Sequence, residues 1–250
     1  MKIGVFDSGV GGLTVLKQAV EAFPSAHYIY FADTENVPYG TKSKKEIKKL
    51  VLDAVEFLVD KKIDLLIIAC NTATSIAVKT LRKKYAFPII GMEPAVKPAV
   101  LLKQKKNKIL VCATKLTLKE KKLKDLIADL NAKDNVKLLS LQKLVTFAEA
   151  KDWDSKALNN YLKKSFSKIN WKKYKAIVLG CTHFLFYKKQ LSSHIPKHVK
   201  IIDGNTGTVN RMLQLLPTNK KKRKLRISFY SSKKKAKPKK FTEFLDSYNP

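Results

Sequence analysis

The sequence has little cysteine, few acidic residues and no long hydrophobic run. Its 250 residues include three cysteines, an odd and small number that supplies no disulfide framework and favours a reducing compartment. No apolar run approaches the roughly 20 residues that a membrane helix needs. The first residues, MKIGVFDSGVGG, lack the charged leader and long apolar stretch of a signal peptide. These absences predict a cytoplasmic protein without a membrane segment.

The scarcity of acidic residues gives the chain an unusual charge. Fifty-one Lys and Arg against 20 Asp and Glu give a net charge of +31, and 47 of the 51 basic residues are lysine. Such a balance is typical of polyanion-binding proteins, but nucleic-acid sites usually add arginine and stacking aromatics. Lysine is instead spread over nearly every predicted helix, a distribution that is expected if all proteins of the organism are rich in lysine. The stretch from Lys220 to Lys240, with twelve basic and no acidic residues, is kept as a candidate polyanion-binding segment, although nucleic acid is not the expected partner.

The apolar residues, 45% of the chain, suffice for a large buried core and follow a regular rhythm. Short apolar runs alternate with helix-period stretches, and several runs are apolar throughout, as in strands buried on both faces. This order predicts an α/β fold with doubly wound, mostly parallel sheets. The strand-like runs are 2–6, 28–31, 65–69, 89–90, 108–112, 136–139, 176–179, 199–202 and 225–230. The amphipathic stretches are 44–59, 75–85, 118–131 and 155–169.

Two cysteines stand in matching sequence contexts. Cys70, in LLIIACNT, and Cys181, in AIVLGCTH, each follow an apolar strand and a small residue and precede two polar residues. They lie 111 positions apart, which predicts two pseudo-symmetric α/β domains with both thiols beyond the carboxyl ends of the strands, where such folds bind ligands. A helix that begins at each cysteine would lower the pKa of its thiol. Cys112, inside KILVCAT, is expected to be an unreactive buried thiol.

A glycine-rich turn follows the first strand. Asp7 precedes it, and Gly9, Gly11 and Gly12 allow a tight turn whose amides can hold a carboxylate or a phosphate. The turn matches neither the dinucleotide-binding fingerprint nor the P-loop. Two roles stay open for Asp7, because an Asp at this position can cap the next helix or can position a proton near a thiol.

A histidine follows the second of the matched cysteines. His183 lies two residues after Cys181 and can tune the protonation of its thiol, although a histidine near an apolar strand is more often structural. The cysteines and histidines have no C-x-x-C or H-x-x-x-H spacing. No metal site is therefore expected.

Taken together, these motifs resemble the glutamate racemases of the cofactor-independent aspartate/glutamate racemase superfamily. The matching pieces are spread in the family's order from the first strand to residue 204. They are FDSGVGGLTVL, YFADTENVPYGTKS, ACNTAT, IIGMEPA, GCTH and IIDG. The resemblance implies one domain from residues 1–94 plus 208–250, a second from residues 95–207, and an active site in the cleft between them.

The resemblance also implies PLP-free racemisation of glutamate by two thiols, with no cofactor. Cys70 would take the α-proton of the D-enantiomer with help from Asp7, and Cys181 that of the L-enantiomer with help from His183 and Glu149. The product would supply bacterial peptidoglycan synthesis, and the enzyme is expected to be a homodimer. The substrate contacts implied are Asp7, Ser8, Tyr39, Gly40, Asn71, Thr72, Thr182 and His183.

Two alternatives stay open. The first is an aspartate racemase or another racemase of the superfamily, although the aspartate branch typically carries Glu after G-C-T, where this chain has His183. The second is a basic polyanion-binding protein with a vestigial site, against which the intact pair of Cys70 and Cys181 argues. The chain also departs from the family pattern, with Leu141-Gln142 in place of a usual Cys-Pro pair and a weakly matched, lysine-rich final third.

Overall fold

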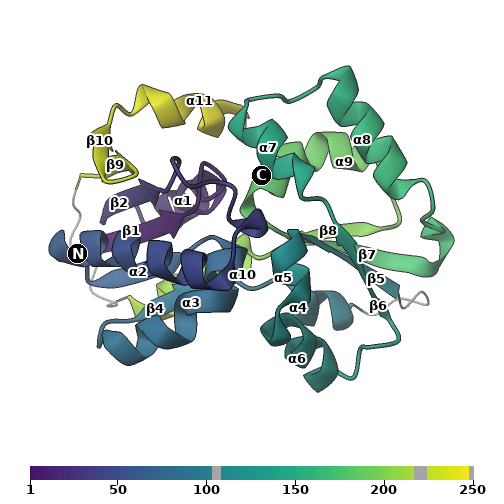
Figure 1. Cartoon of the computed structure of the whole chain (residues 1–250), viewed down its shortest axis with the longest axis horizontal. Coiled ribbons are helices and arrows are strands. Elements are labelled where there is room, and N and C mark those ends of the chain that lie inside the picture. Colours follow the sequence, from purple (N-terminus) through teal and green to yellow (C-terminus); the bar gives the residue numbers. More distant parts are fainter. Residues whose placement is uncertain (103–107, 217–223, 248–250) are drawn as a thin grey trace.

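The computed structural model describes residues 1–102, 108–216 and 224–247 and folds them into two lobes, each built on its own sheet (Figure 1). One sheet has the strand order β10-β9-β2-β1-β3-β4 and the other β6-β5-β7-β8. Neighbouring strands pair in parallel except in the β9–β10 hairpin. The predicted α/β fold with mostly parallel sheets is confirmed. The strands are β1 (Lys2–Asp7), β2 (His27–Ala32), β3 (Leu65–Ile68), β4 (Ile89–Gly91), β5 (Lys108–Ala113), β6 (Val136–Ser140), β7 (Tyr174–Gly180), β8 (Lys200–Asp203), β9 (Arg226–Ser231) and β10 (Lys234–Ala236).

The two sheets repeat one topology. The order β2-β1-β3-β4 in the first lobe matches β6-β5-β7-β8 in the second, so that β3 and β7 occupy equivalent places. The predicted pseudo-symmetry is therefore confirmed. The first lobe adds β9 and β10 beyond β2, and its sheet thus recruits residues from both ends of the described chain.

Helices connect the strands and cover the sheets (Figure 1). The start of α2 is fixed by the side chain of Ser43, whose hydroxyl accepts a hydrogen bond from the Glu46 amide at 3.2 Å. The prediction of one helix over 118–131 is wrong, because extended backbone at Glu120 (φ −68°, ψ 138°) separates α5 from α6. In the described part of the chain, no helix combines the length and apolar character needed to cross a membrane. The helices are α1 (Leu13–Ala22), α2 (Lys44–Asp60), α3 (Asn71–Lys84), α4 (Val96–Val100), α5 (Lys115–Lys119), α6 (Lys121–Asp129), α7 (Lys143–Glu149), α8 (Lys156–Phe166), α9 (Lys188–His194), α10 (Asn205–Leu215) and α11 (Lys239–Ser247), with 3₁₀ turns at Tyr39–Thr41, Trp171–Lys173 and Thr182–Tyr187.

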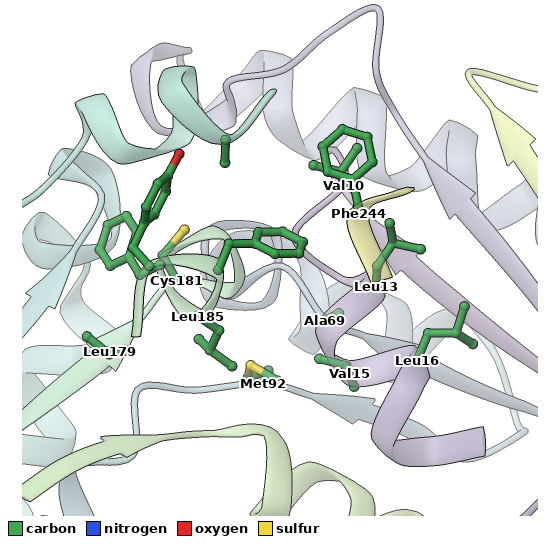
Figure 2. Close-up of a cluster of buried hydrophobic side chains, with 14 of the residues drawn as sticks. Val10, Leu13, Val15, Leu16, Ala69, Met92, Leu179, Cys181, Leu185 and Phe244 are labelled. Carbon is green, nitrogen blue, oxygen red and sulfur yellow. The ribbon is translucent and has the colours of Figure 1, made fainter. Parts of the chain in front are cut away.

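One hydrophobic cluster runs across both lobes. Figure 2 shows Leu13 of α1 and Ala69 after β3 on one side, with Leu185 and Cys181 from the second lobe on the other, and Met92 from the link between the lobes below them. Where the two lobes meet, apolar side chains of this cluster are shielded from water by the opposite lobe, and this burial favours the closed arrangement of the two sheets.

The C-terminal helix α11 crosses from one lobe to the other (Figure 1). Its Phe241 ring stacks on Phe229 of β9, with ring centroids 5.0 Å apart. Its Phe244 ring meets the edge of Trp153 in the second lobe, with centroids 5.9 Å apart. These aromatic contacts add a second connection between the lobes.

Candidate active site

Cys70 lies where β3 ends and α3 begins. Its sulfur accepts a hydrogen bond from the Ala73 amide at 3.4 Å and lies 3.4 Å from the Ser8 hydroxyl. The predicted lowering of the pKa of this thiol is wrong, although the amide at the start of α3 does act in that direction. Burial, reinforced by the negative charge of Asp7, raises the pKa of Cys70 to about 12, and the hydrogen bonds from Ser8 and Ala73 offset only part of that rise. In the closed site Cys70 is therefore a neutral thiol.

Cys181 lies at the equivalent place after β7, at the start of a 3₁₀ turn. Its sulfur lies 3.8 Å from Nδ1 of His183, and Nε2 of that ring lies 2.6 Å from Oε1 of Glu149. Burial alone lowers the pKa of His183, but the hydrogen bonds to Cys181 and Glu149 and the charges of both outweigh it. The net effect holds the pKa of His183 well above its usual value. A positively charged imidazolium thus lies beside the Cys181 sulfur.

Asp7 ends β1 and is completely buried. Its carboxylate accepts hydrogen bonds from the Gly9 amide at 3.0 Å and from the Thr182 hydroxyl, in the other lobe, at 3.1 Å. No side chain caps α1, so the capping role left open for Asp7 is not the one it has. Burial raises the pKa of Asp7 to about 6, although the charge of His183 and both hydrogen bonds act in the opposite direction.

The glycines after Asp7 are explained by contact rather than by backbone freedom. No described glycine has a positive φ. A Cβ atom on Gly11 would lie 2.6 Å from Nδ1 and 2.8 Å from the backbone nitrogen of His183, and one on Gly9 would overlap the Glu149 carboxylate. The amide of Val10 donates to that carboxylate at 2.9 Å. The missing side chains therefore let the first lobe close onto His183 and Glu149.

Most of the predicted site residues line one cavity between the two lobes. Its volume is about 10 Å³, roughly the space of one water molecule. Asp7 and Glu149 do not line the cavity. They lie behind its lining, where Asp7 is hydrogen-bonded to Thr182 and Glu149 to His183. The lining residues are Ser8, Pro38, Tyr39, Gly40, Cys70, Asn71, Thr72, Thr114, Val145, Cys181, Thr182 and His183.

The polar side chains of the cavity are only partly paired. Asn71 donates from Nδ2 to the Met92 carbonyl at 3.3 Å, while its buried Oδ1 has no partner among the described atoms. The Tyr39 hydroxyl donates to Oδ2 of Asp33 at 2.6 Å. Asn71 Oδ1 is therefore an acceptor available to a bound molecule.

Sequence reasoning missed Thr114, which lines the cavity, and Thr117 next to it. The hydroxyl of Thr72 lies 3.0 Å from those of Thr114 and Thr117, which reach it from the second lobe. Thr114 follows β5 as Ser8 follows β1. The rule that led to the cysteines, applied to the end of the 108–112 run, would have found Thr114.

Two observations outside the cavity concern metal binding and polyanion binding. Within the described ranges, no group of three or more His, Cys, Asp or Glu side chains has the arrangement of a metal site. In the basic stretch from Lys220 to Lys240, residues 220–223 lie outside the described residues. Lys233 of that stretch pairs with Asp53 at 2.6 Å and Lys234 with Glu35 at 3.2 Å, so part of its charge is matched within the first lobe.

Comparisons with known proteins agree with this geometry. The chain is 51% identical to glutamate racemase of Halothermothrix orenii over 216 residues, 86% of this chain and 85% of that one. It is 47% identical to glutamate racemase 2 of Bacillus subtilis over 217 residues, 86% and 82% of the two chains. The crystal structure of glutamate racemase from Campylobacter jejuni superposes with a TM-score of 0.84 at 34% identity, over 97% of this chain and 96% of that one.

The match extends along nearly the whole of both lobes. The family model of Asp/Glu/hydantoin racemases matches residues 3–212, a range that holds both matched cysteines and all the residues that line the cavity. With this coverage and relatives of about half-identical sequence, the chain belongs to the Asp/Glu/hydantoin racemase family.

Proposed function

We propose that this chain interconverts L-glutamate and D-glutamate without PLP or any other cofactor, and that it supplies D-glutamate for peptidoglycan synthesis. One observation carries the proposal: Cys70 and Cys181, from equivalent places in two pseudo-symmetric lobes, line the same cavity. Two acid–base groups on opposite sides of a carbon atom are what inversion by proton transfer requires. The relatives named glutamate racemase, and an Escherichia coli glutamate racemase structure described as a complex with L-glutamate, support the choice of substrate.

The two thiols have different surroundings, from which we derive their roles. The imidazolium of His183 lies beside the sulfur of Cys181, while burial keeps the proton on Cys70. In the L-to-D direction the Cys181 thiolate takes the α-proton, and the electron pair of the broken C–H bond stays on the α-carbon and its carboxylate. The Cys70 thiol then gives its proton to the opposite face. The Cys181 thiol and the Cys70 thiolate that result are the starting state for the D-to-L direction.

Asp7 and Glu149 act behind the thiols in this proposal. With a pKa of about 6, Asp7 is a carboxylate at neutral pH and can take a proton when Cys70 must become a thiolate. Glu149 keeps the charge on His183 through their 2.6 Å contact. Each cysteine thus has its own partner, Asp7 for Cys70 and His183 for Cys181.

The polar lining anchors the substrate. The hydroxyls of Ser8 and Thr72, the backbone N–H of Thr182 and the turn at Tyr39 and Gly40 supply donors for two carboxylates, and Oδ1 of Asn71 accepts from the ammonium group. A cavity of about 10 Å³ is too small for glutamate, so the lobes must part to admit it. We take residues 1–94 plus 208–250 and residues 95–207 as the two moving bodies. Sheet membership supports this division, since one sheet uses strands from 2–91 and 226–236 and the other uses strands from 108–203.

The enzyme is proposed to act as a cytoplasmic homodimer. Size-exclusion chromatography with light scattering tests the assembly, since a dimer has twice the mass of the 28.3 kDa chain. A peak at the mass of one chain over a wide range of concentrations would contradict the dimer.

Circular dichroism of L-glutamate incubated with the purified protein tests the proposed function. The signal should decay without added PLP, and it should persist with Cys70→Ala or Cys181→Ala. Cys112→Ala is the matched control, since this buried thiol does not line the cavity. Decay with L-aspartate alone would favour the aspartate racemases, whereas no decay with either would leave polyanion binding, to be tested by salt-dependent retention on DNA.

A further inference from the structure

Asp33 is a buried acidic residue next to the site that the mechanism does not use. It follows β2, is 5% exposed, and donates its backbone amide to the carbonyl of Asp7 at 3.1 Å. Among the described residues, no Lys, Arg or His forms an ion pair with it. A carboxylate removed from water without a cation must be held by hydrogen bonds, because the loss of hydration is otherwise costly.

Three neutral donors point at the Asp33 carboxylate. The Tyr39 hydroxyl donates to Oδ2 at 2.6 Å, and Nδ2 of Asn36 and the hydroxyl of Ser232 donate to Oδ1 at 2.9 and 3.1 Å. Hydrogen bonds to an ionised acceptor are stronger than neutral ones. The carboxylate therefore gathers donors from the loop that leads to Tyr39 and from the hairpin near the C-terminus.

Tyr39 and Gly40, here called the 39–40 wall, form the side of the cavity nearest Asp33. Tyr39 is 1% exposed, and both residues line the cavity. A Cβ atom on Gly40 would lie 2.7 Å from Cβ of Thr114 in the opposite lobe. The wall thus has little room to shift while the lobes are closed, and its position sets the space left for a substrate.

The β9–β10 hairpin reaches the same carboxylate through its turn. Ser232 and Lys233 have φ values of 44° and 71°, the conformation that a two-residue hairpin turn requires at both central positions. The Ser232 hydroxyl, besides donating to Asp33, accepts from the Glu35 amide at 3.0 Å. The hydrogen bonds of the Ser232 hydroxyl therefore help to keep Ser232 and Lys233 in the left-handed region of backbone angles, which residues other than glycine rarely occupy.

We propose that Asp33 is a positioning residue for the substrate: it fixes the 39–40 wall through the Tyr39 hydroxyl and, through Ser232, makes the C-terminal hairpin part of substrate binding. This inference rests on the proposed function. Asp33 touches neither the thiols nor the cavity. Its loss should therefore weaken binding of glutamate far more than it slows proton transfer.

Asp33→Asn tests the inference with little change of size, because an amide cannot accept from donors on both of its terminal atoms. The KM for glutamate should rise about tenfold, the cost of one charge-assisted hydrogen bond, with kcat changed less than about threefold. Tyr39→Phe should raise KM similarly, and the double variant should add little, because both changes break the same contact. Ser232→Ala should raise KM by about threefold, as expected for a neutral donor.

Asp53→Asn is the matched control. Asp53 is an exposed carboxylate that pairs with Lys233 of the same hairpin, so its loss should leave KM unchanged. If Asp33→Asn lowers kcat at unchanged KM, or if its effect adds fully to that of Tyr39→Phe, the positioning role is overturned.

Amide hydrogen exchange supplies a readout that does not depend on racemisation. Exchange at residues 36–42 should speed up in Asp33→Asn and Ser232→Ala but not in Asp53→Asn. If the unmodified protein fails to racemise glutamate, the proposed function falls and the exchange data alone decide whether Asp33 holds the wall. Unchanged exchange in Asp33→Asn would overturn the inference whether or not the protein is active.

Discussion

Replacing Asp7 by Asn should stabilise the fold while it damages the enzyme. Burial raises the pKa of Asp7 from 3.8 to about 6, so the folded chain binds this proton more tightly than the unfolded chain does. The contribution of this bound proton to the free energy of unfolding is fully present below pH 3.8 and is lost as the pH rises through 6. A shift of about two units corresponds to about 3 kcal/mol. At pH 8 the ionised carboxylate therefore costs about that much, and a neutral amide removes the cost.

The stability of Asp7→Asn should depend on pH in a defined way. Thermal unfolding at pH 8 should show the variant about 3 kcal/mol more stable than the parent, which for a chain of this length raises Tm by about 6–12 °C. At pH 4.5, where Asp7 of the parent is largely protonated, the gain should shrink to about 1 kcal/mol. Titrating groups that do not interact with Asp7 contribute equally to both proteins and cancel in the difference. A variant that is no more stable, or whose gain is the same at both pH values, would refute the reasoning.

The same substitution should lower kcat/KM and remove its acid limb near pH 6, because the group that accepts the Cys70 proton is gone. L- and D-glutamate have equal free energies, so the loss in kcat/KM must be equal in both directions. Racemisation followed by circular dichroism between pH 5 and 9 measures it. An acid limb that persists unchanged in the variant would show that Asp7 is not the titrating group.

Three further substitutions test other parts of the account. Gly11→Ala should lower the free energy of unfolding in urea by about 1–3 kcal/mol and abolish racemisation, since its Cβ would clash with His183. Gly207→Ala is the control, because Gly207 lies in α10 with nothing within 4 Å of its Cβ. This control should raise the free energy of unfolding by about 0.5–1 kcal/mol. Cys112→Ala should lose about 1–2 kcal/mol of stability and keep its kcat, and a loss of turnover in folded protein would assign Cys112 a role it lacks here. Glu149→Gln should move the basic limb of kcat/KM to lower pH, because His183 then loses its proton more easily; a basic limb that stays in place would contradict this.

The fold could be predicted because most of its strands are visible in the sequence as short apolar runs. Each predicted strand run agrees with a strand to within two residues. The clearest runs are those of β3 and β7, which are buried along their whole length. The strand β10 was missed because KKA has no apolar alternation and exists only as the hairpin partner of β9. The break at Glu120 was missed because the helix-period pattern continues through it, and only the backbone angles show the interruption.

The structure brings both predicted cysteines to one cavity, but the electrostatics of the cavity were not predicted. The repeated strand–cysteine pattern identified both thiols, because pseudo-symmetry leaves a repeat that one sequence can show. The raised pKa of Cys70 could not be read from the sequence, since it depends on how much water the closed lobes exclude. Asp33 was missed because its partner Ser232 lies 199 residues away, and a contact of that range has no local pattern.

The destination of solvent deuterium tests the two-thiol claim most directly. L-glutamate is incubated with the protein in D2O, and the reaction is stopped before a tenth of the substrate has reacted. The two enantiomers are then separated, and the deuterium content of each is measured by mass spectrometry. Two thiols on opposite faces predict that the new D-glutamate carries deuterium at its α-carbon while the remaining L-glutamate keeps its original proton. Product that retains the substrate's own proton, or deuterium that enters both enantiomers equally from the start, would mean that one group serves both faces and would contradict the account.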